Sequence, residues 1–82
     1  MSSDTRRETI QTLDVTLWVG KGGIEAVTDE LKGQLEERQF VKVKFHRSAR
    51  AGTDTESLAI ELADRVSATV VDTRGHVAVI ER

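Results

Sequence analysis

The sequence predicts an α/β fold, an α+β two-layer sandwich with the element order β-α-β-α-β-β. Three observations lead to this prediction: two apolar runs that alternate like half-buried strands, two segments with helical apolar spacing, and two short β-rich runs near residue 82. Because β-α-β units imply parallel strands and a terminal hairpin implies antiparallel ones, we expect a four-stranded mixed sheet with both helices on one face. Length indicates a single domain, at 13–82, after a tail or short helix at 1–12.

The first strand and first helix are expected between residues 13 and 38. Residues 13–19 alternate like a strand, and their apolar row is Leu13, Val15, Leu17 and Val19. Trp18 falls on the opposite face, where it either stacks on a base or simply covers the sheet. From Ile24 to about Arg38, apolar residues are spaced three, four and four positions apart, which predicts a helix with one buried face.

The second half of the chain repeats this strand and helix pattern. Residues 40–45 alternate so that Lys42 and Lys44 are expected on the open face of the sheet. Residues 47–54 are small and polar, which predicts an exposed basic loop. Thr53 to Glu56 has the pattern of a capping box, with Thr53 as the cap of a helix that ends near residue 66. Residues 68–73 and 76–80 predict a hairpin around Arg74-Gly75.

A glycine-rich turn, Gly20-Lys21-Gly22-Gly23, joins the first strand to the first helix. The glycines allow close approach of another backbone, and the N–H groups of the first helical turn have no intrahelical partners. This geometry favours an anion such as phosphate, and Lys21 adds a cation. The G-x-x-G spacing matches loops that clamp a nucleic-acid backbone, whereas the P-loop and dinucleotide patterns do not fit. The alternative is that these glycines only form a tight connection.

The charge distribution separates the basic and acidic parts of the chain. The formal net charge of −2 argues by itself against a nucleic-acid binder. Residues 40–52 nevertheless contain no acid, while most acids lie in the two helical segments. We therefore expect one locally positive face, because the local field is what steers a partner. Its cations are Lys42, Lys44, Arg47 and Arg50.

Several classes of protein find no support in the sequence. There is no cysteine, hence no disulfide or cysteine-ligated zinc, and no apolar run reaches the roughly 20 residues that span a bilayer. The N-terminal residues lack the apolar core of a signal peptide, so a cytoplasmic protein without a membrane partner is expected. His46 and His76 have no evident catalytic partner. We expect a monomer that is no enzyme and has no cofactor, metal or small-molecule substrate.

Two segments together resemble one family. The first segment is Trp18-Val19-Gly20-Lys21-Gly22-Gly23-Ile24, and the second, after a helix, is Phe40-Val41-Lys42-Val43-Lys44. Together they are similar to the CRM (CRS1-YhbY) domain. The pattern of that family is an apolar strand, G-K-x-G-[IL], a helix and a strand reading about L-[VI]-K-V-[KR]. The similarity extends over about 13–82. It implies a fold similar to the C-terminal domain of translation initiation factor three. Many members have a longer basic N-terminal helix and a final Tyr-Arg, where this chain has Glu81-Arg82.

The resemblance implies RNA binding. Stand-alone family members are associated with precursors of the large ribosomal subunit, and plant members with group II intron splicing. The family's RNA-contacting loop falls on residues 20–23 and its basic strand on Lys42 and Lys44, so we expect an RNA-binding protein of ribosome assembly that contacts ribosomal RNA through this GxxG loop. The acidic balance and the scarcity of lysine suit a salt-adapted archaeal host. Two rivals stay open: a module that binds an acidic protein, and an enzyme that holds a nucleotide phosphate.

Overall fold

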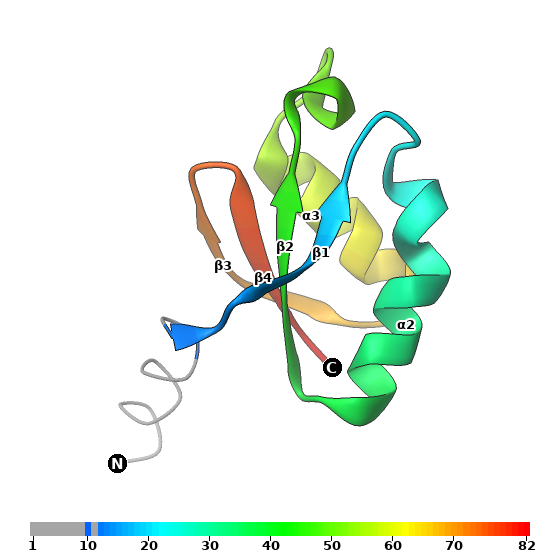
Figure 1. Ribbon diagram of the computed structural model, residues 1–82, viewed down its shortest axis with the longest axis vertical. Helices are drawn as coiled ribbons and strands as arrows, with labels where there is room; N and C mark the ends of the chain where they lie inside the picture. Colours follow the sequence, from blue (N-terminus) through cyan, green and yellow to red (C-terminus); the bar gives the residue numbers. More distant parts are fainter. Residues whose placement is uncertain (1–9, 11) are drawn as a thin grey trace.

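The computed structural model describes residues 10 and 12–82, and it contains the predicted order of strands and helices together with two short 3-10 helices (Figure 1). The prediction for residues 1–12 lies almost wholly outside the described residues. The elements are β1 (Val15–Val19), η1 (Ile24–Val27), α2 (Thr28–Glu37), β2 (Phe40–Phe45), η2 (Arg47–Arg50), α3 (Thr55–Arg65), β3 (Thr69–Arg74) and β4 (Val77–Glu81).

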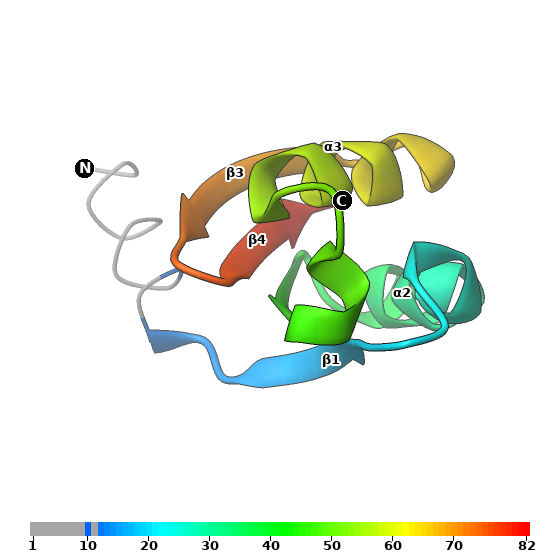
Figure 2. The same cartoon turned by 90° about the horizontal axis from the view of Figure 1, so that it is seen from above.

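The four strands form one mixed sheet in the order β1-β2-β4-β3. β1 pairs with β2 in parallel, and the other neighbours are antiparallel. Figure 2 shows α2 and α3 together on one side of the twisted sheet, as predicted. The hairpin strand β4 lies between β2 and β3, so the strand that follows α3 becomes an edge strand.

The core lies between this face of the sheet and the two helices. Most members of the predicted apolar rows lie in this core or pack against it, and the exception is the start of the first strand. Burial of such side chains is the main favourable term in folding. The largest fully buried members of this core are Phe45, Leu17, Leu31, Leu62, Ile80, Val19, Val41 and Val43, whereas Val79 is buried outside this cluster.

The predicted alternation in the first strand is wrong at one point. An irregularity in the pairing lies between Val15 and Leu17, and it places Val15 opposite Lys42. Thr16 faces α2, because its hydroxyl donates to Gln34 Oε1 (2.7 Å) and Gln34 Nε2 donates to the carbonyl of Thr16 (2.9 Å). The hydrogen bonds between Thr16 and α2 thus occur at a bulge in β1. The bulge moves Val15, which precedes it, to the open face of the sheet.

The predicted first helix begins as a 3-10 helix. Ile24 and Val27 both pack on the core, and their spacing of three residues matches the 3-10 repeat. From Val27 the spacing becomes four residues through Leu31 and Leu35, and the chain continues as the α-helix α2. Thr28 Oγ1 donates to the carbonyl of Ile24 at this junction (2.9 Å).

The predicted capping box of the second helix is wrong by one residue. α3 begins at Thr55, which is buried, and the cap is Asp54 rather than Thr53. The Asp54 carboxylate accepts a hydrogen bond from the backbone N–H of Ser57 (2.7 Å). That bond lowers the pKa of Asp54 below its ordinary value, because it favours the ionised carboxylate.

Two connections also differ from the prediction. The segment expected as an exposed loop contains η2, which is held in place as Ala49 packs against the core. The hairpin turn is Gly75-His76, one residue later than expected, and Gly75 has a φ of 60°. Among the residues that the structure describes, no helix is long and apolar enough to cross a membrane.

Candidate nucleic-acid interface

Three connections meet at one end of the sheet. The glycine turn follows β1, η2 follows β2, and the β3–β4 turn reaches the same end (Figure 1). Backbone hydrogen bonds join them: His46 N–H donates to the carbonyl of Val19 and Phe45 N–H to that of His76, both at 2.8 Å. Because β1 and β2 are parallel, their C-terminal ends bring the glycine turn and the basic segment side by side.

The glycine turn is compact, and its last residue has a backbone conformation that glycine alone adopts easily. Gly23 N–H donates to the carbonyl of Gly20 (2.9 Å), which closes the turn. Gly23 has φ 72° and ψ −173°, a combination found almost only in glycine. A Cβ at Gly22 would lie 2.9 Å from Ala26 Cβ, whereas one at Gly20 would meet only His46 Cδ2, at 4.0 Å. Gly23 is therefore required by its backbone conformation and Gly22 by its close contact with Ala26.

The helical segment behind this turn begins without a side-chain cap. Within residues 10 and 12–82, no side chain accepts a hydrogen bond from the first N–H groups of η1 or α2. Glu25 is the acidic residue nearest the turn, and its carboxylate lies 3.8 Å from the guanidinium of Arg65 on α3. The first backbone N–H groups of a helix lack intrahelical partners, so this start remains suited to an anion.

The predicted cations at this end differ in their freedom. Lys21 and Arg47 are exposed. Arg50 is half-buried, and its Nε donates to the carbonyl of Phe45 (3.2 Å), which fixes the side chain against the end of β2. Lys21 and Arg47 are thus available to an extended anionic partner, while Arg50 presents only the rest of its guanidinium.

The open face of the sheet continues from this end as a row of side chains. The strand register places Trp18 opposite Lys44, Lys44 opposite Val77 and Val77 opposite Arg74, on four neighbouring strands. Trp18 is 51% exposed, so it is a surface aromatic rather than part of the core. An exposed indole beside a free ammonium group is a suitable platform for a base and its phosphate.

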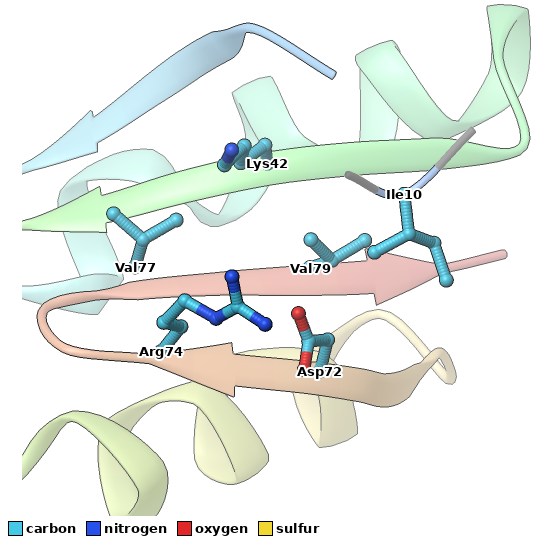
Figure 3. A pocket seen from close by; sticks show the side chains of 6 residues that line it. All are labelled: Ile10, Lys42, Asp72, Arg74, Val77 and Val79. Carbon is cyan, nitrogen blue, oxygen red and sulfur yellow. The ribbon is translucent and has the colours of Figure 1, made fainter. Parts of the chain in front are cut away.

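Lys42 lies apart from the other predicted site residues. It is on the open face, as expected, but it is half-buried and its Nζ donates to the carbonyl of Leu13 (3.1 Å). Figure 3 shows it at a cavity that also has Asp72 and Arg74 at its side. Lys42 thus belongs to the centre of the sheet face, whereas Lys44 lies toward the glycine turn.

Four polar residues at these surfaces were not among the predicted site residues. His46 and His76 come to the same end of the sheet through the strand pairing. Asp72 and Arg74 join the open face because β4 places β3 beside it. The two-residue spacing of Asp72 and Arg74 indicates that they share one face of β3. It does not show which strand lies beside them, so their place on the open face follows only from the strand order. Asp72 also means that the open face is not uniformly basic.

Comparison with known proteins identifies relatives of this chain. A family model described as the CRS1 / YhbY (CRM) domain matches residues 3–82. The "Probable RNA-binding protein MJ0652" of the archaeon Methanocaldococcus jannaschii is 40% identical over 70 residues, which are 85% of this chain and 52% of that protein. The chain thus spans about half the length of this curated relative.

A solved structure has the same fold. The solution structure of the hypothetical protein SAV1595 from Staphylococcus aureus, described as "a putative RNA binding protein", superposes with a TM-score of 0.75 at 28% identity. The match covers 93% of this chain and 78% of the other. The sequence comparison and the fold comparison therefore both lead to proteins that are described as probable or putative RNA-binding proteins.

Proposed function

The chain belongs to the CRS1/YhbY (CRM) domain family, and we propose that it is an RNA-binding protein that recognises structured ribosomal RNA during assembly of the large ribosomal subunit. In this proposal the backbone of the RNA meets the glycine turn, Gly20 to Gly23, and then crosses the open face beside Trp18 and Lys44. Arg47, Arg50 and Lys42 add positive charge around this path. No covalent step is part of the proposed function.

One observation supports the proposal most directly. The uncapped helical start and the exposed Lys21 lie beside the basic segment of β2 and η2, because β1 and β2 are parallel. Backbone N–H groups and flexible cations bind phosphate oxygens without reading bases. Both relatives named above carry descriptions as RNA-binding proteins, which agrees with this chemistry.

The mode of recognition follows from how few aromatic side chains are available. Trp18 is exposed at the open face, and Phe40 is half-buried near the opposite end of the sheet. Extended single-strand readers use several stacking side chains in succession. We therefore expect most of the affinity to come from phosphate contacts and the shape of the RNA.

The test is a salt titration of RNA binding with two charge-reversal variants. Lys21→Glu changes the tip of the glycine turn, and Lys32→Glu makes the same charge change on the exposed side of α2. We expect Lys21→Glu to weaken binding to structured ribosomal RNA about tenfold and to reduce the slope of log K against log salt by roughly one unit. Lys32→Glu should leave both quantities close to those of the wild type.

Three controls separate the rival functions. Equal losses in the two variants would mean that only net charge matters and would remove the turn from the site. Absence of RNA binding even at low salt, with tight binding to an acidic protein, would favour a protein-interaction module. Saturable binding of a free mononucleotide in place of RNA would favour an enzyme that uses the turn for a nucleotide phosphate.

A further inference from the structure

A cavity of about 360 Å³ opens on the face of the sheet that the helices leave uncovered. Figure 3 shows its lining: Val77 and Val79 on β4, Lys42 on β2, Asp72 and Arg74 on β3, and Ile10 at one side. Its volume is within the range of small-ligand sites, about 300–1,000 Å³. The cavity lies beyond Trp18 and Lys44, next to the proposed path of the RNA.

The strand register gives the cavity an apolar floor with polar groups on both sides. Lys42 and Asp72 are both opposite Val79, one on each neighbouring strand. Since neighbouring strands are about 4.8 Å apart, the backbones of these two residues are separated by roughly 10 Å. Arg74 follows two residues after Asp72 on the same face of β3. Because Val79 is itself buried, a flat group would rest on the half-buried Val77 and meet hydrogen-bonding groups at its edges.

The polar groups differ in whether they are already engaged. The ammonium group of Lys42 is fixed by the carbonyl of Leu13 and keeps further N–H groups free. Lys42 thus has a partner within the protein. Among residues 10 and 12–82, the side chains of Asp72 and Arg74 form no hydrogen bond or ion pair. The side facing β3 therefore offers a carboxylate acceptor and a guanidinium donor to a ligand.

Because the lining carries two cations and one carboxylate, it favours a ligand that presents both hydrogen-bond donors and acceptors. Asp72 would repel a phosphate at this position, whereas an unpaired base is uncharged and flat. Among the four RNA bases, guanine alone carries two adjacent donors on its Watson–Crick edge, the N1–H and the N2 amino group, which match the two oxygens of a carboxylate. Its O6 and N7 acceptors then suit Lys42 or Arg74.

We propose that this cavity holds an unpaired guanine base of the bound RNA and that Asp72 is the residue that selects it. The inference rests on the proposed RNA binding and adds a base-specific contact to it. Specific recognition of RNA commonly uses the edges of unpaired bases in loops and bulges. The phosphate contacts at the glycine turn would supply affinity, and the cavity would determine which unpaired nucleotide is preferred.

The test compares short oligouridines that carry one central guanosine, inosine or adenosine. Inosine keeps N1–H and O6 but lacks the amino group, so it removes one of the two donors. The wild type should bind the guanosine RNA about tenfold more tightly than the adenosine RNA, with inosine between them. Asp72→Asn should reduce this preference to within about twofold, while Asp64→Asn, the same change on the exposed side of α3, should preserve it.

The outcomes separate this inference from the proposed function. Equal affinity for the three RNAs, together with weaker binding by Lys21→Glu, would overturn the base site and leave RNA binding intact. Absence of binding to any RNA would overturn both. If Asp72→Asn does not fold, the comparison of guanosine with inosine in the wild type tests the same contact from the side of the RNA.

Free guanosine identifies the source of the base. A nucleoside should not displace the guanosine RNA at concentrations that saturate the protein with RNA, because it lacks the phosphate contacts. Displacement by guanosine, without any preference among the three RNAs, would mean that the cavity is a nucleoside site, which overturns the inference.

Discussion

α3 begins with a carboxylate over its first N–H groups, whereas the helical segment that leads into α2 begins behind a turn of three glycines. At α3, Asp54 accepts the N–H of Ser57 at 2.7 Å. At η1 the residue in the same position is Gly23, and no side chain among the described residues caps it. Both helices pack on the same face of one sheet, so their different starts do not come from different surroundings in the core.

This difference separates a helix start that is complete from one that can still take a ligand. A side-chain cap satisfies an orphan N–H group and typically stabilises a protein, so leaving it out has a cost. Gly23 adds to that cost, because glycine loses more conformational freedom on folding than any other residue. The capped start belongs to the folding of α3, and the uncapped start lies at the proposed contact with RNA phosphates.

The largest effect is expected for an alanine at Gly23. Gly23→Ala should lower the free energy of unfolding by about 1–3 kcal/mol, because alanine does not adopt this backbone conformation without strain. Gly33→Ala in α2 makes the same change where a Cβ meets only open space, and it should raise the stability by about 0.5–1 kcal/mol. Urea denaturation measures both. Effects of equal sign would show that the conformation of Gly23 is not what requires glycine.

The second effect concerns the ligand rather than the fold. Gly20→Asp adds a carboxylate to the glycine turn, next to His46, where a Cβ has room and the backbone is not strained. We expect RNA affinity to fall about tenfold, equivalent to about 1.4 kcal/mol, because the carboxylate competes with phosphate. The matched control is Gly33→Asp, which should bind RNA like the wild type. Unchanged binding by a folded Gly20→Asp protein would contradict the phosphate role of the turn.

Local patterns in the sequence were sufficient for most of the fold. The alternation of Val41, Val43 and Phe45 and the spacing of Leu31 and Leu35 predicted the buried faces, because burial repeats with the period of the element. Where two local signals competed, the prediction was wrong by a residue: Thr53 and Asp54 are adjacent and both are good caps. The bulge near Val15 involves a contact with α2 that no local pattern contains.

The candidate site depended more strongly on long-range pairing. The glycine turn and the basic strand could be recognised from adjacent residues, and their roles in RNA binding stay predictions. The cavity could not be recognised, because Asp72 and Arg74 reach Lys42 only through the insertion of β4 between β2 and β3. Sequence spacing alone does not determine that strand order.

The smallest effect is expected at the capped helix. The pKa of Asp54 is lowered by the N–H of Ser57, so its stabilising contribution is fully present above the ordinary value of 3.8 and is lost as the pH falls through the lower value of the folded state. Asparagine is also a good cap but does not ionise. Asp54→Asn should therefore resemble the wild type at neutral pH and lose less stability below pH 3.8, as measured by urea denaturation at a series of pH values. The RNA affinity of Asp54→Asn should be unchanged, because the proposed phosphate site is at the glycine turn that precedes η1 and α2. Identical acid dependence in the two proteins would mean that the ionisation of Asp54 contributes nothing to folding. A loss of RNA binding would mean that the two helix starts are not independent.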